Sequence, residues 1–156
     1  MHAVYLASVY LHIICATLWI GGMLFLVLVL MPAIKNNANR RELLNNVGIR
    51  LRTVGWATLL LLLITGLFNA YYRGISLQYC LSSPYGRLFL YKISIFAIIA
   101  AISFYHDFFA GPQAIREMAQ GTDSRKFVKL ARIIGQLNLL LALAAAFIGE
   151  IIVRGW

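Results

Sequence analysis

The sequence predicts an all-α integral membrane protein, in which a single domain forms a bundle of four transmembrane helices. The chain of 156 residues is 62% hydrophobic and only 12% charged, which is too apolar for an ordinary soluble domain. It contains four apolar stretches that each reach the roughly 20 residues needed to cross a bilayer as a helix. Since lipid offers no hydrogen bonds to the backbone, helices are the expected structure of stretches this long.

The first span is expected at about residues 3–32. It has no basic segment before it and is longer than the apolar part of a signal peptide, so we expect a helix that is retained. Pro32 and the Asn-rich stretch after it are expected to end this helix. Within it, "LHIICATLWIGG" places His12, Cys15 and Trp19 on one face at helical spacing.

The second span is expected at about residues 53–73. The preceding "RRELLNNVGIRLR" carries leucines at helical spacing, which predicts an interfacial amphipathic segment that leads into the span. Inside the span, Asn69 shares one helical face with Thr58 and Thr65.

The third and fourth spans are expected at about residues 87–109 and 131–154. A stretch with several turn-forming residues precedes the third span, on whose face Lys92 lies with residues such as Ser103. On the fourth span, Gln136, Leu143 and Glu150 follow one another at intervals of two turns, which predicts an inward-facing stripe.

The formal net charge of +9 is concentrated in two groups. One group consists of Lys35, Arg40, Arg41, Arg50 and Arg52, and the other of Arg116, Arg125, Lys126, Lys129 and Arg132. Both groups lie between spans, so the positive-inside rule explains them without a nucleic acid. The positive-inside rule predicts a multi-pass protein of the bacterial cytoplasmic (inner) membrane, with both termini on the outer, periplasmic side. Binding of anionic lipid is a second interpretation of the same groups.

Four polar side chains from four different spans are predicted to lie at similar depth. With a rise of about 1.5 Å per residue, His12 lies roughly 7 Å to the outer side of the bilayer centre. Asn69, Lys92 and Glu150 lie roughly 9 to 12 Å to the same side. Because ionisable groups at such depth usually face the interior of a bundle, this layer predicts a shared site.

Each of these residues also has a structural explanation. Lys92 could extend its stem to the interface, Glu150 could pair with Lys92 or Arg154, and Asn69 could hold helices together. His12 is harder to explain in this way, because imidazole is the commonest metal ligand. His106 lies roughly 20 Å from His12 in depth, too far to share one metal ion, and is expected to be an interfacial histidine.

Two segments resemble known membrane families. "LHIICATLWIGGMLFLVLVLMP" and "SPYGRLFLYKISIF" are similar to the first helix and the "PYGRLLLxK" signature of the copper-resistance D (CopD) family. The first segment also resembles HemJ-type protoporphyrinogen oxidases, membrane proteins associated with b-type haem. In that family a histidine of the first helix and a later lysine are functionally important, and His12 and Lys92 match them by motif.

These observations leave three functions open. The first is a redox protein that binds haem b through His12, with Lys92 as second ligand. Asn69, Glu150 and Trp19 would line that site, and Arg73 and Arg87 would pair with the haem propionates. It would transfer electrons to a partner or oxidise a porphyrinogen or quinol, which leaves enzymatic activity undecided.

The second function is copper transport or resistance, with His12, Cys15 and Met23 as ligands on the first helix. The third is a non-catalytic subunit of a larger membrane complex. Self-association into a homo-oligomer is compatible with all three. A second ligand from His2 would require that the N-terminus folds back.

Overall fold

The computed structural model describes residues 2–120 and 126–154, and it contains four helical spans that are long and apolar enough to cross a membrane. The spans are His2–Ala33, Arg40–Tyr72, Pro84–Gln120 and Lys126–Arg154. No strand occurs within these described ranges. The predicted all-α membrane bundle is therefore confirmed.

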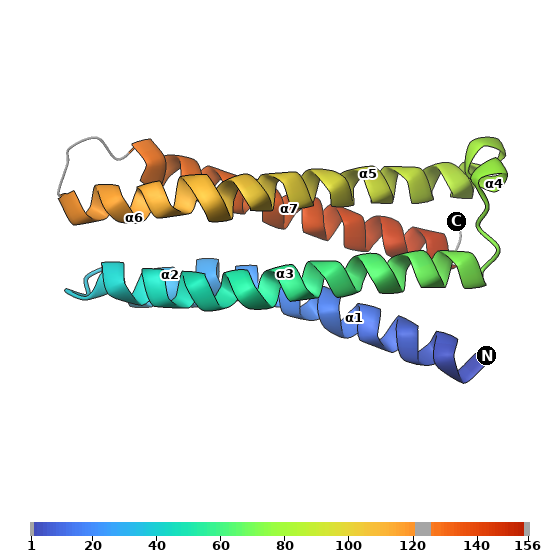
Figure 1. Ribbon diagram of the computed structural model, residues 1–156, viewed down its shortest axis with the longest axis horizontal. Coiled ribbons are helices and arrows are strands. Elements are labelled where there is room, and N and C mark those ends of the chain that lie inside the picture. Colours follow the sequence, from blue (N-terminus) through green and yellow to red (C-terminus); the bar gives the residue numbers. More distant parts are fainter. Residues whose placement is uncertain (1, 121–125, 155–156) are drawn as a thin grey trace.

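The spans run alternately up and down one long axis (Figure 1). The elements are α1 (His2–Phe25), a π-helical turn (Leu26–Leu30), α2 (Met31–Ala33), α3 (Arg40–Tyr72), α4 (Leu77–Ser82), α5 (Pro84–Tyr105), a second π-helical turn (His106–Ala110), α6 (Gly111–Gln120) and α7 (Lys126–Arg154). We call the end that carries His2, α4 and Arg154 the termini end. The opposite end, with α2 and the end of α6, is the loop end.

Each π-helical turn precedes a proline by two residues. A proline has no backbone N–H, and its ring crowds the carbonyl of the residue four positions earlier. The backbone widens instead, so Met31 N–H donates to Leu26 O and Gly111 N–H donates to His106 O. The first span consequently continues one residue past Pro32. The third span passes Pro112 and reaches Gln120, well beyond its predicted end at residue 109.

The segment predicted to lead into the second span, residues 40–52, is the beginning of the continuous 33-residue helix α3. At about 50 Å, this helix is longer than the bilayer core, so at least one of its ends extends beyond the hydrocarbon. The connection between the second and third spans contains the short helix α4, whose Tyr79 N–H donates to the Ser76 side chain at 3.2 Å.

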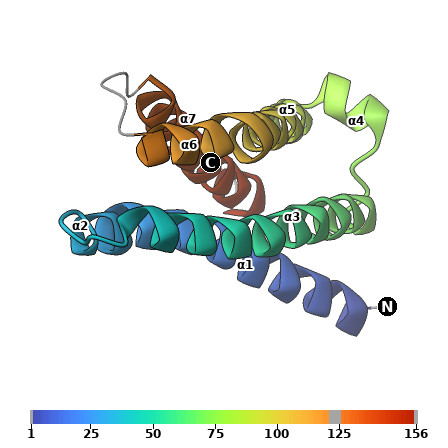
Figure 2. The same cartoon turned by 60° about the vertical axis from the view of Figure 1, so that its left-hand side comes forward.

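The bundle consists of two helical hairpins that lie as two layers (Figure 2). In the first hairpin α1 packs along α3, and in the second α5 and α6 pack along α7. Leu59, Ile99 and Ala142 form a buried apolar cluster between the hairpins. Large apolar side chains such as Tyr10, Leu28 and Phe147 point outward and are about two-thirds exposed, as expected for a surface covered by lipid.

The two hairpins repeat the same order of features. Each begins with a span that contains a π-helical turn and a proline, and each continues through a basic segment into a second long helix. The interval between the two π-helical turns equals the interval between Pro32 and Pro112. The same interval separates His12 from Lys92.

Candidate functional site

His12 is held by a hydrogen bond to helix α3. Its Nδ1 lies 2.7 Å from Thr65 Oγ1, and that hydroxyl donates its proton to the carbonyl oxygen of Leu61 at 2.6 Å. Because a hydroxyl has one proton to donate, Thr65 must accept from an Nδ1–H of His12. The ring also makes a hydrogen bond with the backbone of Leu62. In the tautomer with the proton on Nδ1, the neutral ring carries its lone pair on Nε2. An imidazole nitrogen in this state is able to bind a metal ion.

Gly66 lets the ring of His12 approach the backbone of α3 closely. A Cβ atom at this position would lie 3.3 Å from Cε1 of His12, which is tighter than most real contacts. The neighbouring Thr65 is almost fully buried. The pair Thr65–Gly66 therefore fixes both the position and the tautomer of the imidazole.

Lys92 lies against helix α7. A Cβ atom on Gly149 would come within 2.6 Å of Lys92 Nζ, so the absence of a side chain there makes room for the ammonium group. The charge of Lys92 also acts on the His12 ring. The two predicted residues therefore interact electrostatically between the hairpins, since His12 lies on α1 and Lys92 on α5.

The other predicted site residues near the termini end behave differently from one another. Cys15 is buried, one turn from His12 on α1. Asn69 is half-buried, and its Oδ1 has no partner among the described residues. Glu150 is 56% exposed and forms an ion pair with Arg154, not with Lys92. Glu150 therefore points away from the layer predicted to include it.

Trp19 and Met23 belong to the apolar contact between the hairpins. Both pack against the buried cluster of Leu59, Ile99 and Ala142. The ring of Trp19 also covers Gly55, where a Cβ atom would lie 2.7 Å from Cζ3. Met23 is about 16 Å further along the helix than His12, so the two do not share one ion.

The remaining predicted residues lie at the termini end. Arg73 and Arg87 are both exposed, but only Arg73 lines a cavity there. His2 is the first residue of α1, so the helix holds it about 15 Å from His12 and the N-terminus does not fold back.

The predicted inward face of the fourth span is wrong. Gln136 and Leu143 are exposed, while the buried residues of α7 are Asn138 and Ala142. Asn138 Nδ2 donates to Ser103 Oγ on α5 at 2.7 Å, within the second hairpin. Sequence reasoning missed Asn138, although an amide in the middle of a leucine-rich stretch is a recognisable signal.

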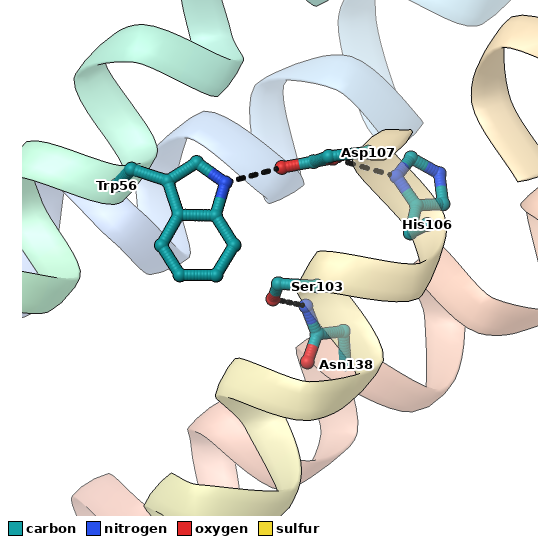
Figure 3. A network of polar contacts seen from close by, with 5 residues as sticks. All are labelled: Trp56, Ser103, His106, Asp107 and Asn138. Atoms are coloured by element: carbon teal, nitrogen blue, oxygen red, sulfur yellow. Dashed lines mark hydrogen bonds and ion pairs between the residues drawn. The ribbon is translucent and has the colours of Figure 1, made fainter. Parts of the chain in front are cut away.

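A second polar cluster lies toward the loop end (Figure 3). Trp56 Nε1 donates to Asp107 Oδ2 at 3.1 Å, which connects α3 to the second π-helical turn. The other carboxylate oxygen of Asp107 accepts from His106 Nδ1 at 2.9 Å. His106 was expected to be a satisfied interfacial histidine, and its ring does have this hydrogen-bond partner. The role of Asp107 as a link between the hairpins was not foreseen.

The described residues contain no group of three or more His, Cys, Asp or Glu side chains placed to hold a metal ion together. Any ion bound at His12 would therefore have few protein ligands. A Cu(I) ion, which accepts two soft or borderline ligands, is compatible with an imidazole and a thiol one turn apart.

Comparison with known proteins gives two matches. The profile of the family described as copper resistance protein D matches residues 45–149. An uncharacterised protein of Aquifex aeolicus (strain VF5) is 34% identical over 149 residues, which cover 94% of each chain. No solved structure matches the chain.

Proposed function

Because the chain belongs to the copper resistance protein D family, we propose that it is a multi-pass membrane protein that handles copper, with His12 and Cys15 as ligands for Cu(I). The observation that carries the proposal is the hydrogen bond from His12 Nδ1 to Thr65, because it leaves Nε2 unprotonated. The description of the family supports copper as the ion, and the hydrogen bond to Thr65 supports His12 as a ligand.

The chemistry of the pair suits an ion inside a membrane. Cys15 would lose its thiol proton when it binds, since the thiolate is the metal-binding form. Cu(I) and a thiolate together carry no net charge, which lowers the cost of holding the ion in a medium of low dielectric constant. The neutral imidazole of His12 completes the coordination without adding charge.

Lys92 limits the affinity of this site. Its ammonium group carries the same sign of charge as the copper ion and lies close enough to act on His12. A protein that passes copper onward must release it, and a nearby cation favours release. Lys92 therefore adjusts affinity in this proposal and is not a ligand.

The proposal is tested with purified protein that competes for Cu(I) against a chromogenic chelator. We expect His12→Ala and Cys15→Ala each to weaken binding at least about tenfold, which corresponds to the loss of about 1.4 kcal/mol. His106→Ala is the matched control, because His106 is bonded to Asp107 in the other polar cluster. Wild-type affinity in both His12→Ala and Cys15→Ala would exclude this site.

One observation favours haem b as a second candidate. The charge of Lys92 acts on His12 from the other hairpin, so an imidazole and an amine would be the residues that hold the haem iron. When bound, haem would supply a one-electron redox couple. In that case Arg73 would face the propionates and an electron-transfer partner would be required.

Lys92→Met separates the two candidates. If copper is the ligand, loss of the like charge leaves Cu(I) affinity unchanged or increases it. If haem is the ligand, the variant loses or shifts the Soret band of the purified protein. A wild-type protein with no Soret band after growth with excess haem precursor would eliminate haem, and a Soret band without Cu(I) binding would eliminate copper.

A further inference from the structure

A cavity of about 390 Å³ lies at the termini end, where the two hairpins meet. Its lining includes Arg73, Ile75 and Tyr79 from the end of α3 and the following connection, and Ile152, Val153 and Arg154 from α7. This volume is within the range of small-ligand sites, about 300 to 1,000 Å³. His12 and Lys92 are not part of the lining, so the cavity is separate from the site proposed for copper.

The cavity has more positive than negative charge. Two guanidinium groups line it, and the nearby acid, Glu150, pairs with Arg154. The other described acids, Glu42, Asp107 and Glu117, belong to elements toward the loop end. Arg73 is therefore left without a carboxylate partner among the described residues.

The contact that Arg73 does make is weak. Its Nη2 donates to the carbonyl oxygen of Ile152 at 3.4 Å, which is long for a hydrogen bond. A basic side chain near the end of a helix interacts favourably with the last carbonyl groups, and this contact is of that kind. A guanidinium group has further N–H donors in a planar fork, and a tetrahedral anion would satisfy them with shorter, charge-assisted bonds.

The depth of the cavity indicates where such an anion is available. About 20 helical residues cross the hydrocarbon, so a span that enters it near Thr53 leaves it near Tyr72. Arg73 then lies at the level of lipid headgroups, while Ile75, Ile152 and Val153 give the cavity an apolar wall. An apolar wall beside two guanidinium groups fits a phosphate group that is attached to an apolar molecule.

We propose that this cavity binds a phosphate group, with Arg73 as the main donor and Arg154 and Tyr79 as additional donors. A phosphate offers several acceptor oxygens, so it accepts from donors on α7 and on the α3–α4 connection at once. Such a ligand connects the two hairpins at the termini end. The phosphate comes either from a lipid headgroup or from a soluble compound.

The test uses the full chain purified in a non-ionic detergent without copper, so its result is independent of the proposed function. Three probes are titrated: short-chain phosphatidylglycerol, diacylglycerol of the same chain length, and inorganic phosphate. The shift of the thermal unfolding midpoint gives an apparent Kd for each. We expect phosphatidylglycerol to bind and diacylglycerol not to bind, and binding of inorganic phosphate as well would show that the phosphate group alone suffices.

Arg73→Gln tests the assigned donor, and Arg87→Gln is its matched control because Arg87 is exposed and outside the cavity lining. We expect Arg73→Gln to raise the apparent Kd at least about tenfold, as for loss of a charge-assisted hydrogen bond. Arg87→Gln should leave it within about twofold. If Arg73→Gln does not fold, Tyr79→Phe replaces it, with an expected rise of about threefold. Equal effects of the variant and its control, or equal binding of diacylglycerol, would overturn the proposal.

Discussion

Thr65 controls which nitrogen of His12 is presented to a ligand. In Thr65→Val the side chain keeps its shape but loses the oxygen that accepts from Nδ1, so the ring is free to change tautomer and orientation. Partners of this kind typically contribute 10- to 100-fold to metal affinity. We therefore expect at least about tenfold weaker Cu(I) binding in chelator competition, with the fold unchanged.

The matched control for this change is Thr53→Val on the same helix. Its hydroxyl also donates to a backbone carbonyl, that of Ile49, but the residue is exposed and remote from His12. Unchanged copper affinity in both threonine variants would mean that the Thr65 hydrogen bond does not prepare the ligand.

A second prediction at the scale of one residue concerns Gly55. An alanine there would place its Cβ 2.7 Å from the ring of Trp19, and this bulky ring is packed between the hairpins. Overpacking of this kind costs about 1 to 3 kcal/mol, so Gly55→Ala should lower the thermal unfolding midpoint in detergent. Gly48→Ala, where nothing lies within 4 Å of the new atom, should leave the midpoint unchanged or slightly higher.

Some individual residues could be singled out from one helix alone. His12 and Lys92 stand out because they are costly in lipid, and the charge of Lys92 acts on the His12 ring. The inward face of α7 was mispredicted because Glu150 lies near the end of its helix and reaches outward to Arg154. Inside a membrane the small residues mark the packed face, so Ala142 and Gly149 were the better guide. Thr65 could not be predicted as the partner of His12, because that contact depends on which helices pair, and one sequence does not specify this.

At the scale of elements, the second π-helical turn aims Asp107 at Trp56. Pro112 causes this turn, because proline lacks a backbone N–H. The substitution Pro112→Ala restores that donor and allows an ordinary α-helical turn, which rotates His106 and Asp107 relative to α3. We expect the hydrogen bond from Trp56 to be lost. In a parent protein that carries Trp19→Phe and Trp156→Phe, the substitution Pro112→Ala should therefore shift the fluorescence emission of Trp56.

Pro32→Ala in the same background is the control, because the first π-helical turn does not contact Trp56 through any hydrogen bond described for these residues. Its emission should match that of the parent. An identical spectrum in Pro112→Ala would show that the turn persists without its proline.

The spans could be predicted from apolar length, because the cost of unpaired backbone groups in lipid leaves little choice. The ends of the spans could not be predicted in this way. Pro32 was expected to end the first helix and the third span to end near residue 109, but wider π-helical turns accommodate both Pro32 and Pro112. The basic segments around Arg40 and Arg116 are helical as well, since outside the hydrocarbon either a helix or a loop satisfies the backbone.

At the scale of the whole molecule, the charge distribution predicts orientation. We expect the loop end in the cytoplasm and the termini end outside the bacterial inner membrane. With both native cysteines replaced by alanine, a membrane-impermeant maleimide should label Ser76→Cys in intact cells. Asn37→Cys should react only after permeabilisation. The reverse pattern of labelling would show that the protein is inserted the other way round.

The recurrence of π-helical turn, proline and key side chain at one constant interval has a consequence for the origin of the bundle. Duplication and fusion of one ancestral helical hairpin would produce this recurrence. Two separate copies of that hairpin would pair as a symmetric dimer and present identical side chains at the level of His12 and Lys92. Fusion would let each copy change alone, so that one carries an imidazole at this level while the other carries an amine. An asymmetric site of this kind is available only to a fused chain.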